Sequence, residues 1–347
     1  MKRRGNPKSS QFRAKISLVA TLTFLAALPT CTAAEEVRQP WTIIFPMIEN
    51  DSFFGISDRH YTNGLYASAT SGKQPDCNWC RSLADTLMLR SGVDGPDFHY
   101  GFFAGQSMFT PEDLSLFQPD SRDRPYGGWL YIGARLHRET DDVLDRAQFA
   151  IGVVGPGSGA DAVQRWWHAL HWFGGVPPQG WHAQIKDEPG LVLTEQRIWR
   201  VSLTRGSIDT ELLPEAAASL GNVFTYAGAG ATLRVGQSLL ADWGPARIEP
   251  SLDGSDFANF DQLNPLAWSL FAGFEVRAVA RNIFLDGNSF QHSANVTKVP
   301  LVADFDAGAA ILWKWIRFQA TYTVRTHEFE TQNGNDRFFS FTLSFAH

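Results

Sequence analysis

The sequence predicts an all-β fold, a transmembrane antiparallel β-barrel of about 12 strands with a short helix in an extracellular loop. Three observations support this fold class. The chain begins with a segment typical of a secretory signal peptide. No later run approaches the roughly 18 apolar residues that a transmembrane helix needs. Strand-length segments with alternating side chains then follow one another to the C-terminus.

The N-terminal segment has the three parts of a signal peptide. Basic residues come first, residues 16–28 form an apolar run, and small residues follow at 32–34. We therefore assign residues 1–34 to a signal peptide and residues 35–347 to an outer-membrane β-barrel. Lipidation of Cys31 ranks second, because the two residues before it make a poor lipidation site.

The charge balance argues against nucleic acid as a partner. The whole chain has a formal net charge of −6, and the signal segment contains six basic and no acidic residues, so its removal leaves −12. A chain this acidic lacks the basic surface that phosphate groups require. If the mature protein meets a membrane, it does so as a barrel or from the surface.

The last strand shows the alternation most clearly. Bulky apolar residues stand at 339, 341, 343 and 345, and Ser340, Thr342 and Ser344 stand between them. In an outer-membrane barrel the apolar face meets lipid, whereas in a soluble β-sandwich it forms the core. Twelve segments of this kind, the even number that such barrels have, are predicted at residues 41–48, 65–71, 99–108, 129–137, 148–154, 197–204, 211–220, 226–235, 268–279, 302–313, 316–325 and 338–345.

Two features lie between the strands. Cys77 and Cys80 occupy a polar loop, and an exported protein can keep such a pair as a disulfide. A zinc site would need two more ligands nearby, so we expect a structural bridge. After the strand at 148–154, a helical run is predicted from Ser158 or Asp161 to about residue 173, where two glycines end it.

The polar segments gather at one end of the predicted barrel. With a periplasmic N-terminus, the connections after the first, third and fifth strands are external, and these hold residues 49–64, residues 110–128 and the helix. The cysteine pair lies at the opposite end. Because sites are commonly built on loops at one mouth of a scaffold, the external rim is where we expect the chemistry.

His168 is the candidate general base. It shares a helix face with Gln164 and Trp172 at i, i+4 and i+8 spacing. An imidazole can take a proton near neutral pH. The alternative interpretation is an ordinary polar residue on a loop helix that is packed by its tryptophans.

The first external loop offers oxygen donors. Asn50 has an amide oxygen, Asp51 a carboxylate, and Thr62 a hydroxyl on the returning strand. Hard oxygen donors suit Ca²⁺, although Asn and Asp are also ordinary turn residues. A cation there would stabilise the oxyanion of an ester while His168 draws a proton from water. No serine nucleophile is then required, and the chain has no G-x-S-x-G elbow.

Several motifs in a fixed order resemble one family. The segments E-N-D-S-F-F, D-R-H-Y-T-N-G, D-R-P-Y-G-G-W-L-Y, G-V-V-G-P, V-Q-R-W-W-H and P-Q-G-W-H-A-Q are similar to those of the LpxR family of outer-membrane lipid A 3′-O-deacylases. The resemblance spans nearly the whole mature chain. It implies a twelve-stranded barrel that removes the 3′-acyloxyacyl group from lipid A, or lipopolysaccharide, in the outer leaflet. It also implies Ca²⁺ dependence and a phospholipase A2-like mechanism.

Carried over by motif, Asn50 and Asp51 are the metal-side pair, with Asn50 also catalytic; Thr62 supplies the hydroxyl and His168 is the base. Three positions depart from the family pattern. Ser52 stands where other members have a second aspartate, a glycine at 174 or 175 stands for a glutamate, and the loop after the third strand lacks a lysine. The candidate substitutes are, for the lysine, Arg122 or Arg124 and, for the glutamate, Asp187 or Glu188.

The sequence thus predicts a hydrolase of lipopolysaccharide modification, located in the bacterial outer membrane with its site facing the outer leaflet. Two alternatives stay open. One is a non-catalytic outer-membrane pore or structural barrel. The other is a secreted β-sandwich that binds calcium or sugar.

Overall fold

The structure, a computed structural model, describes residues 40–53, 59–88, 95–169, 177–260 and 266–347. The predicted signal peptide therefore lies outside the described residues. The named elements are thirteen strands and three α-helices: β1 Thr42–Asn50, β2 His60–Thr70, α1 Asn78–Leu87, β3 Asp97–Thr110, β4 Gly127–Glu139, β5 Val143–Val154, α2 Ala160–Ala169, β6 Glu188–Trp199, β7 Val201–Thr204, β8 Asp209–Gly221, β9 Phe224–Gln237, β10 Leu266–Asn282, α3 Ile283–Asp286, β11 Leu301–Trp313, β12 Ile316–Arg325 and β13 Asp336–Ala346.

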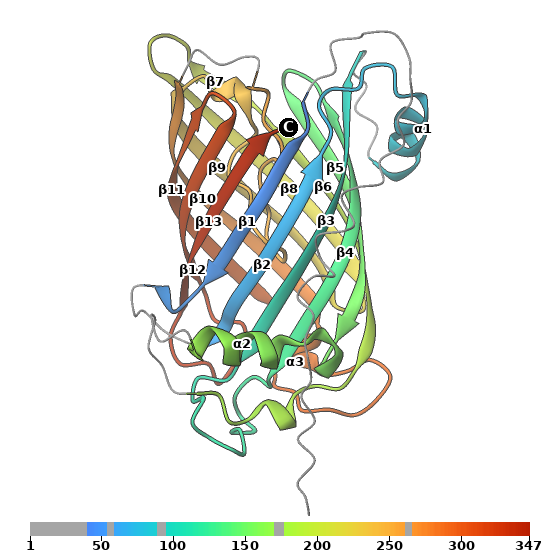
Figure 1. The fold of residues 1–347 in the computed structure, drawn as a ribbon, viewed down its shortest axis with the longest axis vertical. Helices are drawn as coiled ribbons and strands as arrows, with labels where there is room; N and C mark the ends of the chain where they lie inside the picture. Colours follow the sequence, from blue (N-terminus) through green and yellow to red (C-terminus); the bar gives the residue numbers. More distant parts are fainter. Residues whose placement is uncertain (1–39, 54–58, 89–94, 170–176, 261–265) are drawn as a thin grey trace, which may run out of the picture. The chain divides into compact units, whose positions relative to one another are not determined.

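The strands form one closed antiparallel sheet (Figure 1). Strands that are neighbours in sequence pair with each other, except that β6 pairs with β8 and not with β7, and β1 also pairs with β13. β6 and β7 pair with successive parts of β8, so β7 continues β6 beyond a break at Arg200 and the barrel has 12 staves. The predicted antiparallel barrel is confirmed. None of the helices in the described ranges is long and apolar enough to span a membrane.

Three strands begin at least five residues earlier than predicted: β2 begins at His60 and β5 at Val143, each five residues before its predicted start, and the sixth strand differs most. The sixth was expected at residues 197–204, but β6 begins at Glu188. Its second and third residues are Pro189 and Gly190. These residue types are typical of turns, so the sequence pattern did not indicate a strand here. These residues nevertheless pair with Val153 and Gly152 at the end of β5, and the tertiary pairing overrides the local preference.

The alternation of side chains gives the wall two different faces. On β13, Ser340, Thr342 and Ser344 are buried inside the barrel, whereas Leu343 is exposed on the outside. Large apolar side chains are exposed on the outer face all around the wall. They include Phe102, Ile132, Phe149, Leu193, Leu220, Leu270, Phe305 and Phe318. A polar interior with an apolar exterior is the pattern of a membrane-spanning barrel, which favours it over a soluble sandwich.

The two ends of the barrel carry different elements. Trp41 and His347 exchange backbone hydrogen bonds of 2.8 Å, so the first described strand and the C-terminus meet at one end. Helix α1 lies at this terminal end, and α2 and α3 lie at the other, the α2 end (Figure 1). Cys77 and Cys80 form a disulfide in the first turn of α1, which confirms the expected bridge.

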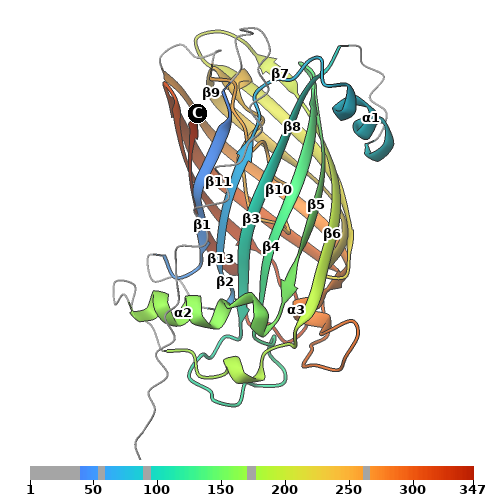
Figure 2. The ribbon, with the colours of Figure 1, turned by 45° about the vertical axis from the view of Figure 1, so that its right-hand side comes forward.

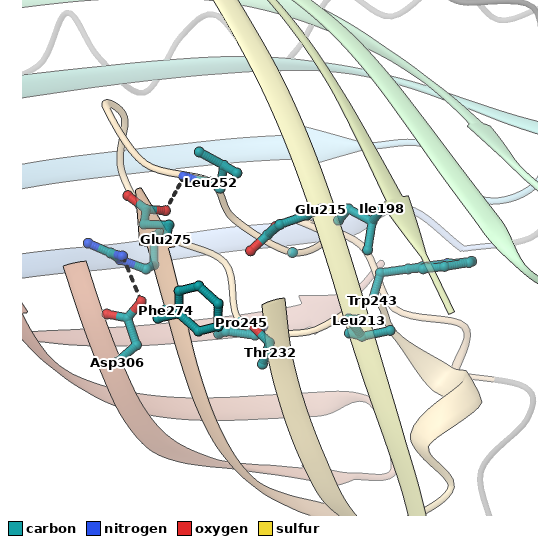
Figure 3. Close-up of a pocket in the computed structure, with 12 residues that line it drawn as sticks. Ile198, Leu213, Glu215, Thr232, Trp243, Pro245, Leu252, Phe274, Glu275 and Asp306 are labelled. Atoms are coloured by element: carbon teal, nitrogen blue, oxygen red, sulfur yellow. Dashed lines mark hydrogen bonds and ion pairs between the residues drawn. The ribbon is translucent and has the colours of Figure 1, made fainter. Parts of the chain in front are cut away.

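The connection between β9 and β10 enters the barrel. We call residues 238–260 the lumen segment. Residues 241–258 are all buried except Glu249, which is half-buried. The backbone of this segment bonds to the wall from several sides: the N–H of Ile248 donates to Glu49 on β1, and that of Leu252 donates to Glu275 on β10 (Figure 3).

Four of the five charged residues of the lumen segment meet an opposite charge on the wall, and the fifth, Glu249, accepts hydrogen bonds from Gln148 and Thr194 of the wall. The ion pairs, with nitrogen–oxygen distances in parentheses, are Asp242 with Arg234 (2.5 Å) and Arg317 (3.2 Å), Arg247 with Asp306 (2.9 Å) and Asp304 (3.2 Å), Asp253 with Arg146, and Asp256 with Arg135 (2.9 Å) and His137 (3.0 Å). Figure 3 shows the ion pair between Asp306 and Arg247 beside the cavity that remains between the lumen segment and the wall. Because a buried charge without a partner is strongly unfavourable, these pairs fix the segment in register with the wall.

We expect Asp256→Ala to lower the free energy of unfolding by about 3–5 kcal/mol, because Arg135 would then stay buried without its carboxylate. Urea unfolding in lipid or detergent, followed by tryptophan fluorescence, measures the change. The matched control is Glu330→Ala, since Glu330 is an exposed acid at the α2 end. Its effect should stay within about 0.5 kcal/mol. Equal stability of the two variants would show that the Asp256 pairs do not hold the lumen segment.

Candidate functional site

A cavity lies on the outside of the barrel wall, under helix α2. In Figures 1 and 2, α2 runs across the strands at the lower end of the barrel. The cavity is lined by residues from β1 and the residues after it, from β2 and β3, and from α2: Asn50, Ser52, Thr62, Asn63, Met108, Val163, Gln164, Trp167 and His168. Three of the four predicted site residues, Asn50, Thr62 and His168, therefore line one cavity.

The end of β1 supplies one wall of this cavity. Asn50 is the last residue of β1 and pairs with Asn63 on β2 and with Phe339 on β13. Its Oδ1 accepts hydrogen bonds from the backbone N–H of Ser52 (2.8 Å) and from the Ser52 hydroxyl (2.5 Å). These bonds fix the amide oxygen of Asn50 and turn the chain out of the strand.

Asp51 lies beside the cavity rather than among its lining residues. Its side chain is buried, and its Oδ2 accepts a hydrogen bond from the backbone N–H of Arg59 (2.5 Å). The backbone N–H of Asp51 donates to the carbonyl of Thr62 at 3.4 Å. The Asp51 carboxylate, directly after Asn50, thus links the end of β1 to the residue that precedes β2.

A β-bulge directs Thr62 into the site. The pairing of β2 with β3 shifts between Tyr61 and Asn63, which leaves Thr62 as an extra residue. Tyr61 packs inside the barrel, where its hydroxyl donates to Glu49 at 2.8 Å. Both Thr62 and Asn63 then face the outer cavity, an arrangement that strict alternation would forbid. The Thr62 hydroxyl is held by the Thr110 hydroxyl at 2.6 Å.

Helix α2 is held against the wall by close backbone approach. A β-carbon at Gly128 would lie 2.3 Å from Ser158 Oγ and 2.4 Å from the Ala160 β-carbon, so only glycine lets the helix start this near to β4. Gln106 on β3 donates to the Ser158 carbonyl at 2.7 Å. Ser158 was one of the two predicted start residues, and its hydroxyl is 3.4 Å from the Ala160 N–H at the first turn.

The helix presents one face to the cavity. Gln164 and His168 both line it, as their i, i+4 spacing predicts, and Val163 and Trp167 complete the face. Gln164 is buried and accepts a hydrogen bond from Trp181 Nε1 at 2.6 Å, which fixes its amide. His168 is half-buried in the last turn of the described helix. Residue 172, expected on the same face, lies outside the described residues.

Aromatic side chains extend the cavity along the outer wall. Trp167 lines the cavity and contacts Phe53, with ring centroids 6.3 Å apart. Phe53 contacts Phe341 at 5.4 Å, and Phe341 stacks on Phe318 at 6.3 Å. Since Phe318 is exposed on the outer face of β12, this row of aromatic contacts joins the cavity lining to the apolar surface of the barrel.

A buried histidine beside the site links β2 to β13 and to the β3–β4 connection. His60, the first residue of β2, has Nδ1 2.6 Å from Asp336 on β13 and Nε2 3.6 Å from Asp123 in the β3–β4 connection. Burial of Asp123 would raise the pKa of its carboxyl, but hydrogen bonds from His60 and from the backbone N–H of Glu112 hold that pKa below the ordinary value. The neighbouring residue, Arg59, is the one that contacts Asp51.

The proposed substitutes for missing family residues lie elsewhere. Arg122 pairs with Asp120 on the exposed loop, and Arg124 is buried against Glu328 at 3.0 Å. Asp187 accepts from the Gly157 N–H, and Glu188 accepts from Asn222 and Ser289. None of the four lines the cavity. Their side chains instead stabilise the loops of the α2 end.

The donors near the cavity suit a hard cation of low affinity. Amide and hydroxyl oxygens of Asn50, Ser52, Thr62 and Asn63 line it, and the carboxylate of Asp51 is adjacent. No group of three or more His, Cys, Asp or Glu side chains that could hold a metal occurs in the parts of the chain that the structure describes. Oxygen donors with one carboxylate are compatible with Ca²⁺ and argue against transition metals.

Sequence reasoning missed Met108, Val163 and Trp167 as lining residues. The parity of β3 could have identified Met108, because the outward positions of that strand are the even ones. Val163 and Trp167 each lie one residue before Gln164 and His168. Their place in the lining could be recognised only once the position of α2 on the wall was known.

Comparison with known proteins gives the family. The family model described as "Outer membrane protein LpxR" matches residues 18–347. The solved structure of LpxR from Salmonella typhimurium has a TM-score of 0.69 and 22% sequence identity, and the match covers 88% of this chain and 99% of that chain. The beta domain of the Bordetella autotransporter BrkA has a TM-score of 0.41 and 11% identity, with 90% and 99% of the two chains covered. Among curated proteins, no match is found. Because the family model spans nearly the whole sequence, the chain belongs to the LpxR family of outer-membrane proteins.

Proposed function

We propose that the protein is a carboxylic ester hydrolase of the outer membrane that removes an acyl chain from lipid A, as a Ca²⁺-dependent 3′-O-deacylase. The observation that carries this proposal is the position of the cavity. It lies outside the wall and is lined by a histidine and by residues with amide and hydroxyl oxygens, and aromatic contacts lead from its Trp167 to the lipid-facing surface. An ester in the surrounding leaflet can therefore reach it sideways, without entering the lumen.

The orientation of the barrel supports the outer leaflet as the source of substrate. At the terminal end the connections at 140–142, 205–208 and 314–315 are short, and of the two longer ones the first contains α1 and the second contains the lumen segment. At the α2 end the connections at 111–126, 155–187 and 283–300 are long, and the one at 222–223 is short. Short turns are periplasmic and long loops extracellular in such barrels. The cavity then opens toward the leaflet that contains lipid A. The buried lumen segment gives no support to the alternative of a passive pore.

The residues of the cavity have distinct roles in this proposal. His168 accepts a proton from water as its oxygen attacks the ester carbonyl, and it returns the proton to the leaving sugar oxygen when the acyl–oxygen bond breaks. Asn50 and Asp51 would hold Ca²⁺, with Ser52 as a further donor. When bound, the ion supplies positive charge that stabilises the oxyanion. Thr62, held by Thr110, orients the ester, and the Trp167–Phe53–Phe341 surface takes the acyl chain.

His168→Gln should lower the rate of lipid A deacylation by about 10²–10⁴-fold, because the general base is lost. Mass spectrometry of lipid A incubated with the purified protein in detergent measures released acyl groups. The control is His182→Gln, since His182 is an exposed histidine in the same connection as His168, where it stacks on Phe117 of the β3–β4 connection. Full activity of His168→Gln would contradict the assigned base.

Removal of Ca²⁺ by chelation should abolish deacylation, and re-addition should restore it. With one carboxylate in the donor set, half-maximal activity is expected at roughly 10⁻⁴–10⁻³ M Ca²⁺. Asp51→Asn should shift this midpoint to higher Ca²⁺, whereas Asp113→Asn, at an exposed loop acid, should not. Activity that persists in chelator would refute the metal role while leaving the hydrolase assignment to the His168 test.

Gly128→Ala should displace α2 and lower deacylation by about 10²-fold, because a misplacement near 1 Å disrupts alignment of reacting groups. The barrel itself should still fold, which heat-modifiable migration in detergent gels reports. The control is Gly206→Ala, where an added β-carbon meets no atom within 4 Å. Unchanged activity of Gly128→Ala would show that the position of α2 is not critical.

A further inference from the structure

Helix α1 packs on the outside of the barrel wall. Its residues Cys80 and Ala84 are fully buried in a cluster with Phe98, Leu136 and Ala147. These wall positions alternate with side chains that face the lumen: His99 and His137 both contact Phe257 of the lumen segment, and Arg146 pairs with Asp253. Phe98, Leu136 and Ala147 therefore belong to the outer face, and α1 covers them from outside (Figure 2).

The outer face beyond α1 is exposed and apolar. On β3 the next outward residues are Tyr100 and then Phe102, whose side chain is 57% exposed. On the neighbouring strands Ile132 and Phe149 are likewise exposed. In an outer-membrane barrel this belt faces the lipid chains, so α1 lies at its periplasmic edge.

The surface of α1 that the wall does not cover is divided into two flanks. Trp79, Leu83 and Leu87, spaced at i, i+4 and i+8, are 55%, 40% and 41% exposed and form an apolar flank. Asp85 and Ser82 are exposed on the other flank. An uncovered apolar flank opposite a polar flank is typical of helices that lie in a membrane interface.

Contacts with the wall show which way each flank faces. β3 begins at the terminal end, so Tyr100 lies nearer to the lipid-facing belt than Phe98 does. Trp79 contacts Tyr100, with ring centroids 5.3 Å apart. Asp85 lies 3.9 Å from Arg138, which pairs in register with Phe98. The apolar flank is therefore on the belt side of the helix and the polar flank on the periplasmic side.

Charged side chains on the outer face lie at the same height along the barrel as α1. Arg138 pairs with Asp145 at 2.6 Å, and Asp145 pairs with Arg197 at 2.5 Å, across β4, β5 and β6. All three alternate with lumen-facing residues and so point outward. A row of outward charges fits the headgroup region and not the hydrocarbon, because lipid chains cannot solvate ions.

We propose that α1 is an interfacial anchor that inserts Trp79, Leu83 and Leu87 among the phospholipids of the periplasmic leaflet. The occupant is lipid because the flank is continuous with the lipid-facing belt and lies at the level of the charged row. The anchor is held in place from both sides of its start: the Cys77–Cys80 disulfide closes its first turn, and the N–H groups of Ser71 and Gln74 donate to carbonyls of β3. A fixed helix at this edge sets the depth of the barrel in the bilayer.

Photocrosslinking in proteoliposomes tests the anchor without disturbing the disulfide. The variant Leu83→p-benzoylphenylalanine should form covalent adducts with phospholipid, detected by mass spectrometry of the purified protein. Phe102→p-benzoylphenylalanine, in the belt, is the positive control. Asp85→p-benzoylphenylalanine, on the polar flank of the same helix, should give far fewer lipid adducts. Heat-modifiable migration shows that each variant is folded.

Two results would overturn the proposal. Adducts between two copies of the chain at position 83 would show that a second protein molecule covers the flank. Equal lipid labelling at positions 83 and 85, or none at 83 while 102 reacts, would show that the helix has no membrane-facing side.

Discussion

Closure of the sheet between β1 and β13 is the constraint on which the rest of the structure depends. Once the last strand pairs with the first, backbone donors and acceptors along the wall bond within the sheet, and the wall can meet lipid. Alternation then gives each strand one face for lipid and one for the lumen. Every feature that does not suit lipid has to leave the outer face, be covered there, or lie at a rim.

The lumen follows from this constraint. A wall whose inner face carries residues such as Arg135, Arg146 and Asp304 needs opposite charges inside, since water-poor interiors do not tolerate unpaired ions. The lumen segment brings those charges from the terminal end, and its own backbone bonds to wall carboxylates. The interior therefore serves rigidity, and a site for a membrane substrate has to be built on the outside.

The sequence predicted the wall well because alternation is local information. It predicted three lining residues of the cavity, Asn50, Thr62 and His168, through motifs of the LpxR family together with strand order. The lumen segment was not predicted, because its charges make sense only beside wall residues far away in the sequence. The predicted start of β6 was wrong for a similar reason. Pro189 and Gly190 are residue types typical of a turn, and they form a strand only because they pair with β5. The bulge at Thr62 likewise has no local signature.

The two helices on the outer wall solve the same problem at opposite ends. At the terminal end, α1 covers Phe98 and Leu136, and the outward charges beside it neutralise one another. At the α2 end, polar Asn63 and Gln106 point outward on strands that otherwise face lipid, so they need cover that can form hydrogen bonds. Helix α2 gives that cover, and the space it leaves over Asn50 and Thr62 is a cavity that both polar and apolar side chains line, beside a row of aromatic rings on the outer wall. A site suited to an ester with lipid chains thus arises where the outer face of a barrel stops being apolar.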